Sequence, residues 1–336
     1  MDPFTQGIVG STAAQIVSKK NKLFIASIIG LLAGLAPDLD IFIRSSADPL
    51  LFLEYHRHFT HSLLFIPFGS LICAVVFYNV FAKRLSLTFK ETYFYSFLGY
   101  ATHGIIDSFT TYGTLLFWPF TNDRIAWNTV SVIDPLFTIP ILILALSSIK
   151  KRNKIFSIYA IIWIFLYQMV AYTQKLRAEE LIYNYAQTFN HKIESIEAKP
   201  SFGNIIVWKV IYSTSDKYYV NAIRLSLDHK IYPGESIEKL DVNKSFPWLD
   251  ANSQQAKDIE KFRWFSNGYL GVDKKNRYVI YDVRFSTIPN QVEGLWGIKL
   301  DENKKDSEHV EYVTNRKRDL DRFNILINMV SGTHEN

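Results

Sequence analysis

Cysteine is almost absent from this chain of 336 residues, since only Cys73 occurs and it lies inside an apolar run. A disulfide scaffold needs at least one pair of cysteines, and a cysteine-ligated zinc site needs several. The sequence therefore excludes both.

Several well-known catalytic and nucleotide-binding motifs are also missing. The chain has no Gly-x-Ser-x-Gly nucleophile elbow, no Walker loop and no dinucleotide fingerprint. Its second half also lacks a cationic excess, with 24 basic and 23 acidic residues between positions 174 and 336. Nucleic-acid binding needs a surplus of positive charge, so we expect no nucleic-acid partner.

Charge of either sign is scarce in the first half. Residues 1–173 contain 22 of the 69 Asp, Glu, Lys and Arg residues, about 13% of that part, whereas residues 174–336 contain 47, about 29%. We therefore expect a membrane domain over residues 1–173 and a soluble domain over residues 174–336.

Five segments of the first half are long and apolar enough to be membrane helices. At a rise of about 1.5 Å per residue, each can cross a hydrocarbon core about 30 Å thick. A large soluble helical core is the alternative, but the run from Ser62 has no polar face to turn toward water. The predicted helices are Leu23–Ile43, Ser62–Ala82, Tyr93–Phe109, Val132–Ile149 and Ile155–Tyr172.

Basic residues in the short loops predict the orientation of these helices, because Lys and Arg favour the cytoplasmic side. The segment before the first helix and two alternate loops hold ten of them, whereas the intervening loops hold only Arg44, Arg57 and Arg124. We expect a multi-pass protein of the bacterial inner membrane, with a cytoplasmic N-terminus and an extracytoplasmic C-terminal domain. The first apolar run has no cleavage pattern and should remain as an anchor.

The second half begins with a charged helix to about residue 190 and then changes to alternating apolar residues. Segments 204–212 and 217–227 predict one strand pair, and 269–272 with 278–285 predict a hairpin. Shorter strands are expected near 295–300 and 310–313, followed by a helix over 317–329. This pattern indicates a small α+β domain that is mainly β.

Ionisable residues are rare in the first half, and the predicted topology brings most of them to the outer helix ends. His103 and Asp107 are spaced i, i+4, so they share a helix face, which suits two ligands of one metal or a ligand and the residue that orients it. Asp38 and Asp40 follow Pro37, and an extended backbone there would point both carboxylates the same way. Carboxylates and imidazoles at membrane depth are costly, which indicates function.

The segment 56–62 places three imidazoles, a guanidinium and two hydroxyls in seven residues. Thr60 is predicted to cap the second helix, which would put the cluster at the positive end of the helix dipole. Taken singly, these residues could be helix caps, solvated loop residues or a structural hydrogen-bonded pair. Taken together on one side of the membrane, they favour a metal site.

The chemistry that fits such a site is metal-assisted hydrolysis, in which a divalent ion lowers the pKa of a water and polarises an ester. Arg57 would hold an anionic group such as phosphate, and an acidic or histidine side chain outside the metal shell would move protons. We expect the catalytic residues to be Arg57, Thr60 and Asp134.

Several short motifs occur in an order that resembles a known family: Met1-Asp2-Pro3-Phe4-Thr5, Pro37-Asp38-Leu39-Asp40, His56-Arg57-His58-Phe59-Thr60-His61-Ser62, Gly99 to Asp107, Thr110 to Thr114, Trp118-Pro119-Phe120 and Ile133-Asp134-Pro135. They are similar to the membrane-bound metal-dependent hydrolases of bacterial inner membranes, of the LexA-regulated, inner-membrane-associated type. The likeness covers residues 1 to about 150, and a distant similarity to zinc-dependent phospholipase C and single-strand nucleases points to phosphoesters.

This resemblance implies a set of metal ligands, namely Asp38, Asp40, His56, His61, His103 and Asp107. The expected cofactor is zinc, with manganese or magnesium as alternatives. Members usually have a histidine where this chain has Gln6, so the roles of Gln6 and His58 stay open. A glutamine can bind a hard cation through its carbonyl oxygen, but it does not replace an imidazole on zinc with similar affinity.

These observations favour an integral membrane hydrolase that acts on a phosphoester of a lipid or lipid-linked substrate at the outer membrane face. Its first partner is the bilayer itself. The alternative is a catalytically degenerate membrane protein whose C-terminal domain binds a partner or an envelope component.

Overall fold

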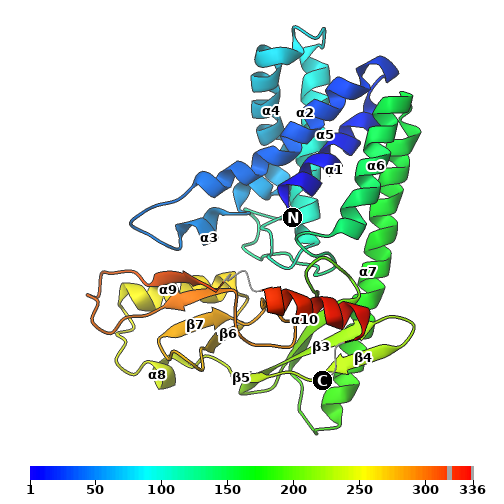
Figure 1. The fold of residues 1–336 in the computed structure, drawn as a ribbon. Coiled ribbons are helices and arrows are strands. Elements are labelled where there is room, and N and C mark those ends of the chain that lie inside the picture. The colour runs from blue at the N-terminus through cyan, green and yellow to red at the C-terminus, as the bar shows by residue number, and fades with distance from the viewer. Residues whose placement is uncertain (316–319, 334–336) are drawn as a thin grey trace. The chain divides into compact units, whose positions relative to one another are not determined.

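Seven helices build most of the N-terminal part of the chain. The computed structural model describes residues 1–315 and 320–333 (Figure 1). Within these residues the helices are α1 Pro3–Val17, α2 Leu23–Leu35, α3 Leu51–Tyr55, α4 Ile66–Phe77, α5 Phe89–Ser108, α6 Pro135–Lys151 and α7 Ile155–Gln187. A 3₁₀ helix, Ala36–Phe42, continues α2, and a π-helical turn, Tyr78–Ala82, continues α4.

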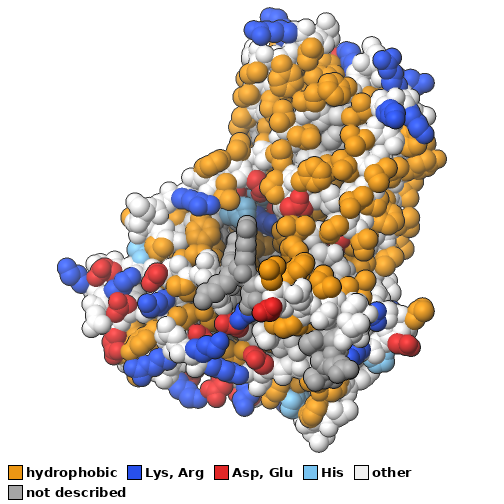
Figure 2. Space-filling model, in the orientation of Figure 1, with side chains coloured by type: hydrophobic (Ala, Val, Ile, Leu, Met, Phe, Trp, Pro, Cys, Tyr) orange, Lys and Arg blue, Asp and Glu red, His pale blue; other side chains and the backbone are white. Residues whose placement is uncertain are grey.

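Three helical segments are long and apolar enough to cross a membrane: residues 20–42, 63–82 and 155–187. Many large apolar side chains on them are exposed, for example Ile72 and Phe165 at 60% and 66%. Figure 2 shows hydrophobic side chains over the visible face of this helical part, with Lys and Arg at the end where α4 leads to α5. Such a surface suits a lipid solvent better than water.

The first helix, α1, was not expected from the sequence, which lacks a long apolar run there. Asp2 caps it by accepting a hydrogen bond from the Thr5 backbone at 3.0 Å, and Pro3 occupies its first turn. Most of its residues are buried, and it packs against α2, α5 and α6. Its small residues allow this packing, because a Cβ at Gly10 would overlap the carbonyl of Gly30 on α2.

The same close approach fixes α5 against α2. A Cβ on Gly99 would collide with the backbone of Gly30, and one on Gly104 would collide with the carbonyl of His61. Both glycines therefore allow close packing of the backbone. Backbone contact between helices leaves little freedom to slide, so the residues on these helices keep a fixed spacing.

The C-terminal part is rich in β-structure and contains two antiparallel sheets. The first has the order β1-β2-β3-β4, with β5 also paired to β3, and the second has the order β6-β7-β8-β9. The strands are β1 Ser195–Pro200, β2 Val207–Ser213, β3 Lys217–Leu225, β4 His229–Tyr232, β5 Ser236–Glu238, β6 Leu270–Val272, β7 Val279–Asp282, β8 Trp296–Lys299 and β9 Glu311–Thr314. Both predicted pairings, β2 with β3 and β6 with β7, are confirmed.

Some features of this part escaped the sequence pattern. The first pair alternates less than predicted, because every residue of β2 is buried. Helices α8 Val242–Ser245 and α9 Gln254–Phe265 were not expected. Helix α10 spans Leu320–Ser331, and residues 317–319 of its predicted range lie outside the described residues.

Contacts divide the chain into two compact units. The helical unit contains residues 1–42, 55–173 and 202–204, and the β-rich unit contains residues 43–54, 174–201 and 205–336. The segment 43–54 therefore has its contacts in the β-rich unit although both of its sequence neighbours belong to the helical unit.

Candidate metal centre

The two aspartates after Pro37 lie on the 3₁₀ helix Ala36–Phe42 that extends α2. The expected extended backbone was wrong, because the chain continues to coil past Pro37. Both carboxylates nevertheless reach one imidazole. Asp38 Oδ1 lies 3.5 Å from Nε2 of His61, and Asp40 Oδ2 lies 3.2 Å from its Nδ1.

The loop 56–62 folds around Asp40. The backbone N–H of Arg57 donates to Asp40 Oδ2 at 3.0 Å, and the Thr60 hydroxyl donates to the same oxygen at 2.8 Å. Arg57 adopts a left-handed backbone conformation, φ 65°, which is uncommon for a residue with a side chain. The predicted capping role of Thr60 was wrong, since Ser62 caps the turn that follows by accepting from the Phe65 backbone.

Helix α5 supplies the other two groups from one face, as the i, i+4 spacing predicts. His103 Nε2 lies 3.7 Å from Asp107 Oδ2, and both side chains are buried. The other nitrogen of His103, Nδ1, is hydrogen bonded to the Gly34 carbonyl on α2 at 2.5 Å. The helix pair therefore fixes the orientation of this imidazole.

Donor atoms from three segments converge here. One atom from each of Asp38, His61, His103 and Asp107 lies within 4.8 Å of the others, which is close enough for one cation. A second group with the same property consists of Asp38, Asp40 and His56. All six ligands expected from the sequence are thus brought together, and Asp38 is common to both groups.

Hydrogen bonding assigns the tautomers of the two buried imidazoles. A carbonyl oxygen only accepts, so Nδ1 of His103 carries the proton and its Nε2 carries a lone pair. His61 Nδ1 faces Asp40, which also accepts, so its Nε2 is bare when the ring is neutral. The two Nε2 atoms lie 2.9 Å apart, with Asp107 Oδ2 3.3 Å from that of His61.

Two imidazole nitrogens and the carboxylates of Asp38 and Asp107 thus converge in one small space, and Arg57 and the Met1 amino group contact Asp107 and supply positive charge there. A divalent cation would bring positive charge to the other groups as well, and an imidazole held by a carboxylate or a carbonyl through its other nitrogen is the usual arrangement around zinc. The donor set of two imidazoles and two carboxylates therefore fits a divalent metal.

Gln6 of α1 belongs to this centre. Its Nε2 donates to Asp107 Oδ1 at 2.8 Å, while its buried Oε1 has no hydrogen-bond partner among the described residues. A buried acceptor without a donor is costly. The amide oxygen is thus available as a further, hard ligand beside Asp107.

Arg57 supplies the positive charge at the rim of the cluster. Its Nε lies 3.0 Å from Asp107 Oδ2, its Nη1 donates to the Thr110 hydroxyl at 2.9 Å, and its guanidinium lies over the Tyr112 ring at 4.9 Å. Neither bond uses Nη2. The anion-binding role that the sequence predicts for Arg57 stays a prediction.

Two residues that the sequence singled out lie outside both metal groups. The ring of His58 packs against Trp118 at 5.4 Å between centroids. Asp134 caps α6 by accepting from the backbone of Leu136 and Phe137, and it also accepts from Tyr167 at 2.6 Å. These contacts make Asp134 the cap of α6, and its expected catalytic role stays a prediction.

Other groups at the centre were not foreseen. Tyr112 supports the guanidinium, Thr110 accepts from it, and the amino group of Met1 contacts Asp107. The sequence signal for the last of these was the capped start of α1, Asp2-Pro3, which brings the first turn to α5. Tyr112 and Thr110 are ordinary loop residues in sequence, and only the fold reveals them.

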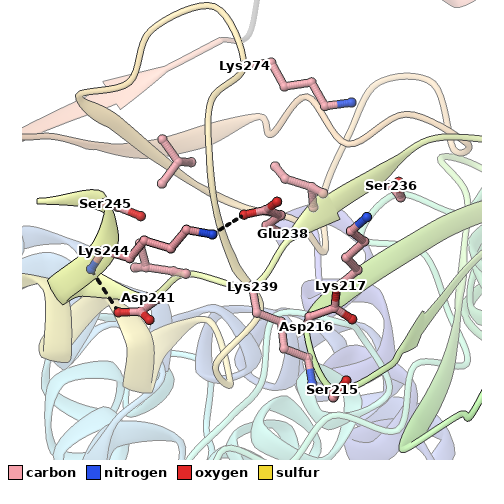
Figure 3. A pocket seen from close by; sticks show the side chains of 13 residues that line it. Ser215, Asp216, Lys217, Ser236, Glu238, Lys239, Asp241, Lys244, Ser245 and Lys274 are labelled. Atoms are coloured by element: carbon pink, nitrogen blue, oxygen red, sulfur yellow. Dashed lines mark hydrogen bonds and ion pairs between the residues drawn. The ribbon is translucent and has the colours of Figure 1, made fainter.

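The β-rich unit has a pocket of its own, of about 800 Å³, at the turns around β3 and β5 (Figure 3). Opposite charges are interleaved in it. Lys244 pairs with Glu238 at 3.2 Å, while Asp241 caps α8. Because positive and negative groups largely neutralise one another there, the pocket favours no particular ligand.

A family comparison agrees with this arrangement of motifs. The model of the YdjM inner membrane protein family matches residues 1–178, which include both metal groups. The chain belongs to the YdjM inner membrane protein family. The YdjM match ends within α7, so the β-rich unit lies beyond it.

One curated relative extends the likeness past the YdjM region. The chain is 24% identical over 228 residues to the uncharacterized protein YfhP of Bacillus subtilis (strain 168), which covers 66% of this chain and 67% of the relative. No solved structure gives a significant match.

Proposed function

We propose that this YdjM family member is a metal-dependent hydrolase of a phosphoester in a lipid or lipid-linked substrate. The observation that supports it is the convergence of the Nε2 atoms of His61 and His103, 2.9 Å apart, beside the carboxylates of Asp38 and Asp107. Such a cluster is expensive in a membrane protein unless it holds a cation.

Each residue of the centre has a part in the proposed reaction. Asp38, His61, His103 and Asp107 would hold a divalent metal, which supplies Lewis acidity and a water of lowered pKa. Asp40 and Thr60 orient His61 through its Nδ1 side. Arg57 would bind the phosphoryl oxygens through Nη2 and neutralise charge that develops on them.

A lipid-linked substrate is favoured because the cluster lies where apolar helices end. Asp38 and Asp40 close the apolar segment 20–42, and His61 immediately precedes the segment 63–82. Residues at such helix ends meet lipid head groups before they meet solutes of the aqueous phase.

Hydrolysis is tested with the full chain in detergent, using chromogenic phosphomonoester and phosphodiester reporters with added Zn, Mn or Mg. We expect turnover with at least one metal and its loss in Asp107→Asn. A Gln6→His variant is assayed in parallel, because it restores the imidazole usual in the family. Activity that appears only in Gln6→His would favour the alternative of a catalytically degenerate membrane protein. If neither the wild type nor Gln6→His binds metal or hydrolyses a reporter, the proposed hydrolase function is refuted.

We also propose that α5 and α6 cross the membrane together with the three long apolar segments, with residues 19–22 on the cytoplasmic side and the metal centre on the outer side. Met1 and Gln6 both contact Asp107, so α1 begins at the metal-centre end of the helices, which differs from the cytoplasmic N-terminus expected from the sequence. The ten basic residues before the first span and in alternate loops support this orientation. In a Cys73→Ala background, Lys275→Cys should react with a membrane-impermeant thiol reagent in cells with a permeabilised outer barrier. Labelling only after the inner membrane is lysed would reverse the orientation.

A further inference from the structure

Segment 43–54 interrupts the metal centre in the sequence. Asp38 and Asp40 precede it, whereas His56 and His61 follow it, and Nδ1 of His56 lies 2.8 Å from Asp40 Oδ1. The contacts of this segment nevertheless lie in the β-rich unit. Segment 43–54 therefore forms a loop between two parts of the helical unit, which end at Phe42 and resume at residue 55. The hydrogen-bonded pair Asp40 and His56 joins the two ends of this loop.

Lys261 of α9 holds both acidic residues of the segment. Its Nζ lies 2.8 Å from Asp48 Oδ2 and 3.3 Å from Glu54 Oε2. Burial alone would lower the pKa of Lys261, but the hydrogen bond to Asp48 and the two negative charges outweigh burial and raise it. The ammonium is therefore charged at neutral pH and tethers residues six positions apart.

A second polar contact supports the same end of the segment. His309 Nδ1 lies 3.9 Å from Asp48 Oδ1 and 3.0 Å from Asp258, which is fully buried on α9. Asp258 also accepts from the Val310 backbone at 3.0 Å. Asp48 is therefore held by Lys261 of α9 and by His309, which lies just before β9.

Apolar side chains complete the attachment. The ring of Phe52 meets Tyr312 edge to face, with centroids 5.0 Å apart, and Leu50 and Leu53 are fully buried. An ion pair at a surface is weak when it stands alone, but here it is combined with buried leucines and an aromatic pair. The segment is therefore a part of the β-rich unit and not a free loop.

We propose that the β-rich unit positions the metal ligands through this segment, with Lys261 as the positioning residue. If segment 43–54 were free, bringing Asp40 and His56 together would cost the entropy of closing that loop. This entropy cost would reduce the free energy of metal binding. When Lys261 holds the segment, the loop is already ordered in the metal-free protein, so metal binding does not have to order it. The inference rests on the proposed function, because it requires a bound metal.

The test compares Lys261→Met with Lys257→Met in the full chain. Lys257 is an exposed residue of the same helix and has no ion pair among the described residues, so it is the matched control. We measure metal affinity by competition with a chromogenic chelator and amide hydrogen exchange of residues 43–54. In Lys261→Met we expect affinity to fall about 10-fold or more and exchange in the segment to accelerate.

Lys261→Arg keeps the charge and should retain both properties, as should Lys257→Met. If Lys261→Met exchanges faster but binds metal as tightly as the wild type, the segment is anchored without positioning the ligands, and the inference is overturned. Unchanged exchange overturns it as well. A wild type that binds no metal refutes the proposed function first, and the inference with it.

Discussion

Replacement of His61 with alanine is expected to abolish metal binding and hydrolysis. His61 is the most connected ligand, because its Nε2 faces Asp38, His103 and Asp107 while its Nδ1 faces Asp40. Its loss removes a candidate ligand together with its contacts to three carboxylates, those of Asp38, Asp40 and Asp107. Loss of a residue that only orients a ligand already costs about 10–100-fold in affinity, so loss of the ligand should exceed about 100-fold. Metal content of the purified chain after dialysis measures the effect.

The matched control for this variant is His58→Phe, three residues earlier in the same loop. It keeps the aromatic contact with Trp118, and His58 belongs to neither metal group. Metal content should stay at the wild-type level in His58→Phe. If both variants lose metal equally, the effect comes from the fold of the loop, and His61 is not a ligand.

Arg57→Lys should leave the metal in place and lower kcat/KM for phosphoesters by about 10²–10³-fold. That is the usual loss when one donor aimed at a developing negative charge is removed. Lysine keeps the charge but cannot contact Asp107, Thr110 and a phosphoryl oxygen at once, as the planar guanidinium can. Steady-state kinetics with the reporter ester and metal analysis of the same sample measure both quantities.

Arg124→Lys is the control, since Arg124 lies over the same ring, Tyr112, at 5.5 Å and donates to the Gly113 carbonyl. Arg124 belongs to neither metal group, so the kinetics of Arg124→Lys should match the wild type to within a few fold. Equal losses in both variants would mean that the stacking on Tyr112 matters and that Arg57 has no direct role in binding the phosphoryl group.

The candidate site could be predicted from the sequence largely because membrane helices exclude charge. A carboxylate or imidazole inside an apolar run is easily recognised in the sequence. The i, i+4 spacing in a helix also predicts that His103 and Asp107 lie on the same face. Turn geometry was less predictable. The coil after Pro37 and the position of the helix cap at Ser62 depend on the Asp40 contacts, which join residues about 20 positions apart.

Helix α1 escaped prediction for a physical reason. Most of its residues are small or polar, and its glycine Gly10 lies against the backbone of α2. Such a helix gives no hydropathy signal. The position of Gln6 was missed for the same reason. Only the packing of α1 shows that its amide contacts Asp107 and that its Oε1 has no hydrogen-bond partner among the described residues.

Three helices meet at a few glycines: Gly10 on α1, Gly30 and Gly34 on α2, and Gly99 on α5. The same helices carry Gln6, the carbonyl that orients His103, and His103 itself. Since backbone touches backbone at this crossing, no side chain can change rotamer there to widen or narrow the space between the ligands. In the proposed function, the spacing of Gln6 and His103 is therefore set by the backbone, and the centre would select cations by their radius and preferred coordination number.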